Sequence, residues 1–436
     1  MPFADVEIYI QKSEADGRYP VNMRVDGLRI LPRGYLPAAA QPPTPTAAHY
    51  ADLAYGQTLF DWLLADPQLK ENWAEIRGEG RARRLRLFLD DAVAALHRWP
   101  WEALCEPARD GQPARSLAAH PDTPFARFLG VKAPLLKPLF RRPVRMLVVA
   151  PRQIDFAEKF PPSQYPDLAQ IDPAYEFETL QNALRPLLDQ NLLTLDLLPA
   201  PCSLAAIVSA LSQARAENKG YHILHLICHG FYKEKTGQTF LLLANQNNRV
   251  KYTIDQRVAA NLSPSLSDDE NGLRLIFLAS CESATRSSAD AFRGLAPQLV
   301  QAGVPAVIAM QDQVGKQTAR EFATKFYTQL LLHSQVNLAA NEARQVITAA
   351  DLPGSVIPVL FLRLADGRLL AHRSPTFTLR SIFDSLIADY RTLFAGRDIQ
   401  FNLAKKTLFT SPLCDEPTLA AIADHITEIC WEWQWL

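Results

Sequence analysis

The feature of this sequence that most constrains its fold is a series of short apolar runs that alternate with helix-forming segments from residue 144 onward. Nearly continuous apolar runs are typical of parallel strands that are buried on both faces. Because parallel strands need long crossover connections, usually helices, the pattern predicts an α/β fold with a mostly parallel sheet flanked by helices. The predicted strands cover residues 144–150, 193–198, 222–227, 240–243, 273–278, 306–309 and 358–363, and the predicted helices cover 174–189, 203–216, 292–302, 317–332 and 336–350.

Two of the predicted strands end in residues with reactive side chains. One strand leads into His229 and Gly230, and another leads into Cys281. Active sites of open α/β sheets lie at the carboxyl ends of the strands. A cysteine thiolate is accessible near neutral pH, and a histidine within reach can take the thiol proton and later protonate a leaving amine. The sequence therefore predicts Cys281 as a nucleophile and His229 as its base.

The neighbours of these two residues indicate how such a site would bind its substrate. Because Gly230 has no side chain, its backbone N–H can form an oxyanion hole together with the N–H of Cys281. Glu282 and Ser283 are expected to shape the loop after the nucleophile and to contribute to substrate binding. Simpler interpretations stay open, with Cys281 as an inert core cysteine and His229 as a residue that only caps a loop.

His222, His225, Cys228 and His229 stand close together in the sequence, which at first suggests a metal site. Side chains alternate between the two faces of a strand, so His225 and His229 point away from His222 and Cys228. We therefore expect no metal here, and no other cofactor. His225 is interpreted as a satisfied histidine packed beneath the site, and Cys228 as a core residue.

Changes in pattern along the chain predict three regions. Residues 1–140 are expected to form an N-terminal accessory domain with a β-hairpin, a linker and helices, and residues 141–374 the α/β domain. Residues 375–436 have helical periodicity, with apolar faces over 379–390 and 419–429. This last region is expected to be a small helical, adaptor-like appendage that recruits partners.

Within the accessory region, local patterns predict strands and a small core. Residues 6–12 and 19–25 alternate apolar and polar side chains around a turn, which predicts the hairpin. The basic segment 81–86 is interpreted as a solvated strand face. Trp99 and Trp101 are interpreted as core packing.

Composition excludes several classes of protein. Of the 436 residues, 48% are hydrophobic and 21% are charged, as in ordinary globular proteins, and the formal net charge of −1 gives no electrostatic reason to bind nucleic acid or an anionic membrane. The six cysteines are scattered without a CxxC pair, which argues against a disulfide framework and a cysteine-rich zinc site. The N-terminus resembles no signal peptide and no apolar run is long enough to span a membrane, so a cytoplasmic location is expected.

Six segments, taken in order, resemble a known family. They cover residues 221–230, 275–284, 294–307, 322–327, 340–344 and 357–361. Together they resemble CHAT-domain proteins, a bacterial branch of the caspase-like (clan CD) cysteine peptidases, over roughly residues 80–372. The resemblance implies a caspase-like fold and a catalytic dyad of His229 and Cys281. In caspases the histidine lies about 50 residues before the cysteine, and the spacing here agrees.

The resemblance also bears on specificity. In relatives that cut after basic residues, an acidic residue shortly after the strand equivalent to 304–311 lines the primary specificity pocket. Asp312 is the candidate for this role, although Lys316 stands near the position where the acid would align. An acidic pocket is therefore one expectation for this chain.

The predicted function is a cysteine endopeptidase that cleaves a protein substrate and stays inactive until a protein partner or ligand triggers it. The family suggests a part in bacterial antiviral defence or programmed cell death, and the polar segment 245–272 is a hypothetical self-processing site. The alternative is a caspase-like scaffold or interaction module without catalysis. A nucleotide-binding protein is disfavoured because no glycine-rich phosphate loop follows the strand at 144–150. The oligomeric state stays open.

Overall fold

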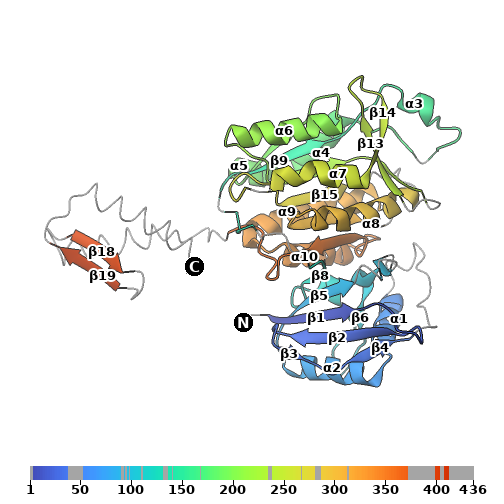
Figure 1. Ribbon diagram of the computed structural model, residues 1–436, viewed down its shortest axis with the longest axis vertical. Helices are drawn as coiled ribbons and strands as arrows, with labels where there is room; N and C mark the ends of the chain where they lie inside the picture. The colour runs from blue at the N-terminus through green and yellow to red at the C-terminus, as the bar shows by residue number, and fades with distance from the viewer. Residues whose placement is uncertain are drawn as a thin grey trace. The chain divides into compact units, whose positions relative to one another are not determined.

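The structure is a computed structural model that describes most of the chain before residue 372 and two short segments after it (Figure 1). Within this part, no helix is both long and apolar enough to cross a membrane. Only the backbone is described at residues 232, 286–293, 398–402 and 407–411. The described residues are 3–37, 53–89, 93, 96–97, 99–109, 111–130, 136–139, 141–166, 168–233, 238–266, 268–279, 286–311, 314–371, 398–402 and 407–411.

Twelve strands of the described residues form one sheet in the order β10-β9-β11-β15-β16-β17-β8-β5-β1-β2-β3, with β4 also paired to β2. Strands of this sheet are present at each of the predicted apolar runs from residue 144 onward except 240–243, which lies in a separate small sheet. The strands are β1 (Ala4–Ile10), β2 (Tyr19–Val25), β3 (Arg29–Ile30), β4 (Gly34–Leu36), β5 (Arg83–Leu89), β8 (Phe125–Phe128), β9 (Val144–Val149), β10 (Leu193–Leu197), β11 (Ile223–Ile227), β15 (Leu275–Ala279), β16 (Ala306–Met310) and β17 (Pro358–Leu362).

Most neighbouring strands of this sheet run parallel. The block β10-β9-β11-β15-β16 is parallel throughout, and β17 is antiparallel to β16. Beyond β17, the strands β8, β5 and β1 are again parallel to their neighbours, and β2, β3 and β4 close the edge with antiparallel pairs. The predicted mostly parallel sheet is confirmed.

Helices cover both faces of the sheet because both faces of its central strands are apolar. In β11, Ile223 and Ile227 belong to one core cluster, and Leu224 and Leu226 belong to the other. The first face is covered by α4 (Pro173–Ala183), α5 (Arg185–Asp189), α9 (Lys316–His333) and α10 (Val336–Ala349), with α1 (Leu53–Leu63) and α2 (Pro67–Gly78) over its N-terminal half. The second face is covered by α6 (Leu204–Ala216), α7 (Asp255–Leu262) and α8 (Arg286–Gln301), which lie side by side in Figure 1.

A small antiparallel sheet stands at the carboxyl end of β11. It consists of β12 (Gly230–Lys233), β13 (Gln238–Ala244) and β14 (Val250–Ile254), in that order. The predicted strand at 240–243 lies in β13. Apolar residues of this sheet pack with the short helix α3 (Phe156–Lys159), which belongs to the connection between β9 and α4. This packing brings a segment far from β11 in sequence close to its end.

The N-terminal strands belong to the same sheet as the strands of the α/β domain. The predicted hairpin is present as β1 and β2, with Val6 opposite Val25. Because β8 pairs with both β5 and β17, hydrogen bonding continues across the boundary predicted near residue 140. The compact unit found from packing covers Met1–Leu370.

The prediction that segment 81–86 is solvated is wrong for two of its arginines. Arg83 is 3% exposed and Arg86 is 5% exposed. Their guanidinium groups pair with Glu106 and Glu7, which are distant in sequence, so the strand pattern alone could not indicate their burial. Four short elements lie between β5 and β8 in the sequence, namely η3 (Trp101–Ala103), β6 (Cys105–Glu106), β7 (Arg115–Ser116) and η4 (Leu117–Ala119).

The second compact unit covers Ala371–Leu436. Its described residues form an antiparallel hairpin of β18 (Asp398–Asn402) and β19 (Thr407–Ser411). The helical faces predicted at 379–390 and 419–429 lie outside the described residues.

Candidate active site

The carboxyl ends of β11 and β15 are neighbours in the parallel part of the sheet. The last residue of β11, Ile227, is paired with the last residue of β15, Ala279. Neighbouring strands lie about 4.8 Å apart, so the chain segments that leave these two strands start side by side. Both side chains lie on the face that α4 and α9 cover. The ends of β11 and β15 therefore share one edge of the sheet, and their last side chains share one face. This corner of the sheet is the candidate site.

His229 lies just beyond the end of β11 and is 2% exposed. Its backbone carbonyl accepts a hydrogen bond from the N–H of Leu242 in β13 (2.9 Å). Its imidazole lies against the ring of Phe156 in α3, with 5.5 Å between the ring centroids. The small sheet and α3 thus hold the backbone and the ring of His229 in one position.

The two ring nitrogens of His229 have different surroundings. Nε2 lies 2.8 Å from the carbonyl oxygen of Ala169. Since a carbonyl oxygen can only accept, Nε2 carries the proton and donates it to this bond. Nδ1 is therefore unprotonated, and it is buried without a hydrogen-bond partner among the described residues. Its lone pair is available to take a proton, as the base of a nucleophile requires.

A closed set of hydrogen bonds positions the Ala169 carbonyl. Gln170 donates from Nε2 to the carbonyl of Gln153 (2.6 Å), and Gln153 donates from Nε2 to the carbonyl of Leu242 (3.0 Å). Leu242 in turn binds the backbone of His229. The connection that carries Ala169 is therefore tied to the same strand, β13, that fixes His229.

Burial lowers the pKa of His229, and the hydrogen bond to Ala169 opposes this shift. The imidazole is therefore neutral near pH 7, because an ordinary histidine already titrates near pH 6.5. A neutral imidazole can act as a general base, whereas an imidazolium cannot.

Gly230 begins β12, directly after His229. It is paired with Leu241 of β13, and the bond from Leu242 to the carbonyl of His229 makes Gly230 and Leu241 a non-hydrogen-bonded pair. The N–H of Gly230 therefore points away from β13, as an oxyanion-hole donor must in order to face a substrate.

Four of the predicted site residues lie outside the described residues. They are Cys281, Glu282, Ser283 and Asp312. The second predicted oxyanion donor, the N–H of Cys281, lies there too. Of the predicted site residues, the structure thus describes His229 and Gly230, which it places next to each other at the end of β11.

The CHAT domain family model matches residues 53–376, about three quarters of the chain. This chain belongs to the CHAT domain family. The match includes β5, β8 and the strands from β9 to β17, so the CHAT domain takes in N-terminal strands as well as the α/β part. Its mostly parallel sheet between two helix layers is the arrangement that the sequence predicts.

Searches of known proteins gave two further findings. No curated protein matches the sequence. Among solved structures, the chain is similar to separase of Saccharomyces cerevisiae in a separase–securin complex, with 13% identity and a TM-score of 0.35 over 70% of this chain and 17% of that chain. It is also similar to RgpB of Porphyromonas gingivalis in a complex of pro- and mature domains, with 11% identity and a TM-score of 0.31 over 66% of this chain and 56% of that chain.

The other side chains of the His/Cys group take structural positions in the CHAT domain. His222 is buried on the opposite face, where Nδ1 accepts from the N–H of Arg145 (3.0 Å) and Nε2 donates to the carbonyl of Glu270 (3.0 Å). Cys228 is fully buried in the core cluster of that face. The described residues contain no group of three or more His, Cys, Asp or Glu side chains that could hold a metal ion.

His225 lies on the same face of the CHAT domain as His229, but deeper. It is 3% exposed, and its Nδ1 lies 2.8 Å from the hydroxyl of Tyr327 in α9. Its ring stacks on Phe277 of β15 with 4.9 Å between centroids. Burial lowers the pKa of His225 to about 3, so this histidine is neutral.

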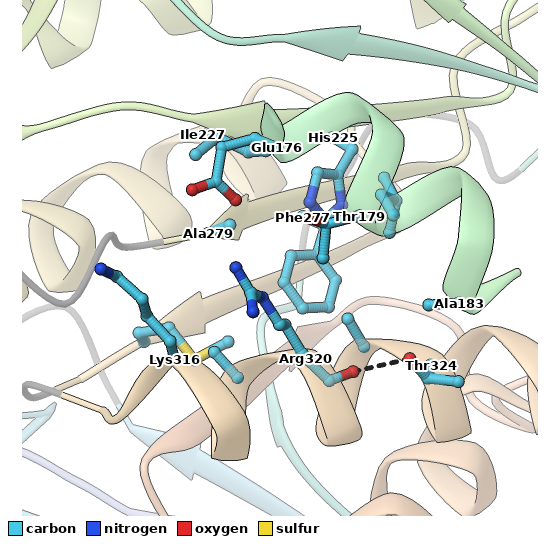
Figure 2. Close-up of a pocket in the computed structure, with 14 residues that line it drawn as sticks. Glu176, Thr179, Ala183, His225, Ile227, Phe277, Ala279, Lys316, Arg320 and Thr324 are labelled. Carbon is cyan, nitrogen blue, oxygen red and sulfur yellow. Dashed lines mark hydrogen bonds between the residues drawn. The ribbon is translucent and has the colours of Figure 1, made fainter. Parts of the chain in front are cut away.

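Two parts of the site were not predicted from the sequence. One is the carbonyl of Ala169, which no side-chain pattern could reveal because any residue supplies a carbonyl. The other is a pocket between the sheet and helices α4 and α9, with Glu176, Lys316 and Arg320 at its charged side (Figure 2). The spacing of Lys316 and Arg320, one helical turn apart, was the available signal for a shared face.

Proposed function

We propose that this chain is a cysteine endopeptidase in which Cys281 is the nucleophile and His229 is the base. The observation that carries the proposal is the unprotonated Nδ1 of His229 at the end of β11, next to the end of β15, which has no hydrogen-bond partner among the described residues. In the sequence, Cys281 follows Ala279 by the same interval by which His229 follows Ile227. We therefore expect Cys281 and His229 to come within the hydrogen-bond reach that this chemistry needs.

The proposed reaction begins with transfer of the Cys281 Sγ proton to Nδ1 of His229. The thiolate then attacks the carbonyl carbon of the scissile peptide bond, and the N–H groups of Gly230 and Cys281 stabilise the oxyanion. The C–N bond breaks as Nδ1 returns its proton to the leaving amine, which leaves a thioester on Cys281. Nδ1 then takes a proton from water as the water oxygen attacks the thioester. The C–S bond breaks to release the acid product, and Nδ1 returns the proton to Sγ of Cys281.

The Ala169 carbonyl takes the role of an orienting group in this proposal. It accepts from Nε2–H and so fixes the tautomer in which Nδ1 is the base. It also stabilises the imidazolium that forms when Nδ1 takes the thiol proton. Glu282, Ser283 and Asp312 are proposed to contact the substrate.

We further propose that the enzyme is inactive until a protein partner or ligand moves the connection between β9 and α4. His229 is 2% exposed, and Phe156 and Ala169 of this connection both contact its ring. A protein substrate can reach Nδ1 only if part of this cover shifts. The family resemblance supports a bacterial defence or programmed-death setting for such a switch.

The test is covalent labelling with a cysteine-protease inhibitor such as a peptide chloromethyl ketone, followed by peptide mapping. We expect labelling at Cys281 in the wild-type protein and a loss of at least 100-fold in labelling rate in His229→Ala. Cys105 and Cys202 serve as internal controls, because burial raises the pKa of both thiols and should keep them unlabelled.

A matched variant separates the role of His229 from general effects of histidine removal. His120→Ala removes a half-buried histidine from the segment between η4 and β8 and should label at the wild-type rate. Labelling of Cys281 at equal and measurable rates in His229→Ala and wild type would refute the dyad and favour a non-catalytic scaffold.

A further inference from the structure

A cavity of about 520 Å³ lies among the end of α2, the hairpin of β6 and β7, and the segment that joins η4 to β8. It shares no lining residue with the pocket between α4 and α9. Pockets for small molecules typically measure about 300–1,000 Å³, so this cavity is large enough for a metabolite. Pro107, Pro113 and Ala114 form the apolar part of its wall, and the rest of the wall is charged or polar.

The buried carboxylate of Glu106 holds the walls of this cavity together. It accepts hydrogen bonds from Nε1 of Trp73 in α2 (2.8 Å), from both Nη atoms of Arg83 in β5 (3.1 and 2.8 Å) and from Nη2 of Arg115 in β7 (2.8 Å). The backbone N–H of Arg83 also donates to the carbonyl of Asp122 (2.7 Å), which fixes the third wall. The side chains that line the cavity therefore project from a preorganised frame.

This carboxylate is shared by more positive charge than it can balance. Burial would raise the pKa of Glu106, but hydrogen bonds and attraction from Arg83 lower it to about 2, so the group is ionised at neutral pH. One negative charge thus faces the two guanidinium groups of Arg83 and Arg115. The four hydrogen bonds use all the acceptor sites of the carboxylate, so it cannot bind a further cation. Arg115 donates only from Nη2 among the described residues, and the rest of its guanidinium group can bind a ligand.

His120 supplies a neutral N–H donor to the same wall. Its Nδ1 accepts from the backbone N–H of Asp122 (3.1 Å), so the proton of the neutral ring is on Nε2. Burial lowers the pKa of His120, and the nearby charge of Arg115 lowers it further. The imidazole is therefore neutral near pH 7, and its N–H lies close to the guanidinium group of Arg115.

Two more arginines line the cavity, Arg77 in the last turn of α2 and Arg109 in the hairpin. Neither has an ion-pair partner among the described residues. The second carboxylate of the wall belongs to Asp122, whose side chain is 61% exposed, so water and salt weaken its repulsion of an anion. Even if Asp110 of the hairpin loop is counted as a third carboxylate, the four guanidinium groups outnumber the carboxylates.

We propose that this cavity binds a small polar molecule through a phosphate monoester group. A carboxylate has two oxygens, which one guanidinium group can satisfy, whereas the cavity offers three guanidinium groups and an imidazole N–H from separate segments. A phosphate monoester has three terminal oxygens and nearly two negative charges at pH 7, which match this set of donors. The volume that a phosphate group leaves free accommodates the organic part, and the Asp122 carboxylate can accept from its hydroxyl groups.

The test is calorimetric titration of the full-length protein with ribose 5-phosphate and with ribose. We expect ribose 5-phosphate to bind at least roughly tenfold more tightly, because charge-assisted hydrogen bonds to the phosphate are gained. Arg115→Gln should weaken its binding roughly tenfold, and Arg115→Lys should recover part of the loss. Because Glu106 keeps Arg83, both variants should fold. Arg109→Gln, which removes an exposed side chain, should weaken binding about threefold or more. Arg33→Gln, an exposed arginine outside the cavity, is the matched control and should bind as wild type does.

Three results would overturn the proposal. They are equal binding of ribose 5-phosphate and ribose, binding that neither Arg115→Gln nor Arg109→Gln weakens, and an equal loss of binding in Arg33→Gln. Tighter binding of a phosphoserine peptide than of ribose 5-phosphate, lost in the same two variants, would assign the cavity to a phosphorylated protein segment instead of a small molecule. None of these titrations depends on peptidase activity, so their outcome and that of Cys281 labelling are independent.

Discussion

Buried polar side chains in the two halves of the sheet differ in their hydrogen-bond and ion-pair partners. In the N-terminal half, Arg127 of β8 is 1% exposed, yet its guanidinium is paired with Glu102 (2.5 Å) and also donates to the carbonyl of Trp99 (2.9 Å). Arg83 pairs in the same way with Glu106 (2.8 Å). A buried charge survives only with such partners, because an unpaired one would cost several kcal/mol.

At the carboxyl ends of β11 and β15 the buried polar groups are neutral and only half satisfied. His229 uses Nε2 and leaves Nδ1 without a described partner, and His225 uses Nδ1 and lies in the wall of the pocket. The paired charges of Arg127 and Arg83 thus have a structural role, whereas the two histidines stand where a reacting group or ligand can enter. Variants of His229, Glu102, His225 and Gln170 test this contrast.

His229→Ala should abolish catalysis while leaving stability nearly intact. General acid–base catalysis contributes about 10²–10⁴-fold, so kcat/KM for a peptide substrate should fall by that factor. The free energy of unfolding in urea should change by less than about 1.5 kcal/mol, because one ordinary hydrogen bond is lost. A large loss of unfolding free energy with unchanged kcat/KM would show that His229 has a structural role and not a catalytic one.

Glu102→Ala should have the opposite effect, with a large loss of stability and little change in catalysis. It leaves the Arg127 guanidinium buried without its carboxylate, and breaking such a pair costs about 3–5 kcal/mol of unfolding free energy. Urea denaturation measures this loss, and kcat/KM per folded molecule should stay near the wild-type value. Glu178→Ala on the exposed side of α4 is the control, and the double variant Glu102→Leu/Arg127→Met should recover most of the stability.

The pH dependence of stability should report the burial of His225. Its folded pKa is about 3, whereas the unfolded value is about 6.5, so the unfolded chain binds the proton first. The contribution of neutral His225 to the free energy of unfolding is fully present above about pH 6.5 and is lost as the pH falls below that value. At pH 5 the difference amounts to about 2 kcal/mol. His225→Phe should show a shallower decrease of unfolding free energy between pH 7 and pH 5 than wild type, and parallel curves would contradict the assignment.

Gln170→Ala should have the smallest effect, because Gln170 acts on His229 only through the backbone of Ala169. Loss of one hydrogen bond that positions this carbonyl should lower kcat by about threefold to tenfold with little change in KM. Gln164→Ala, an exposed neighbour in the same connection, is the matched control. An equal decrease of kcat in the two variants would show that Gln170 has no specific part in positioning the Ala169 carbonyl.

The strands of the α/β part were predictable because each is a nearly continuous apolar run, and such a run by itself indicates a strand that is buried on both faces. The run at 144–150 became β9 (Val144–Val149), and the buried Trp99 and Trp101 confirm the predicted packing. The extension of the sheet through β8 was not predictable, since β8 is short and carries Arg127, whose partners lie elsewhere in the chain. Pairing between distant segments leaves no local pattern.

The site was predictable where it depends on side chains at strand ends, as for His229 and Gly230. It was not predictable where it depends on a backbone group or on tertiary approach. Ala169 contributes a carbonyl, and Glu176 approaches Arg320 only because α4 and α9 cover the same face. The face of each strand residue follows from alternation, but the helix that meets that face does not.

The pairing of β8 with β17 has a practical consequence for anyone who shortens this protein. All five residues of β17 (Pro358–Leu362) are buried, and Phe361 and Leu362 pair with Arg127 and Phe128. A fragment that starts at residue 141 would leave this apolar strand as an open edge, ready to recruit a strand from another molecule and precipitate. Fragments meant for study should therefore keep β1 and the strands that border it, because a start just ahead of β5 would leave β5 as an open edge in the same way.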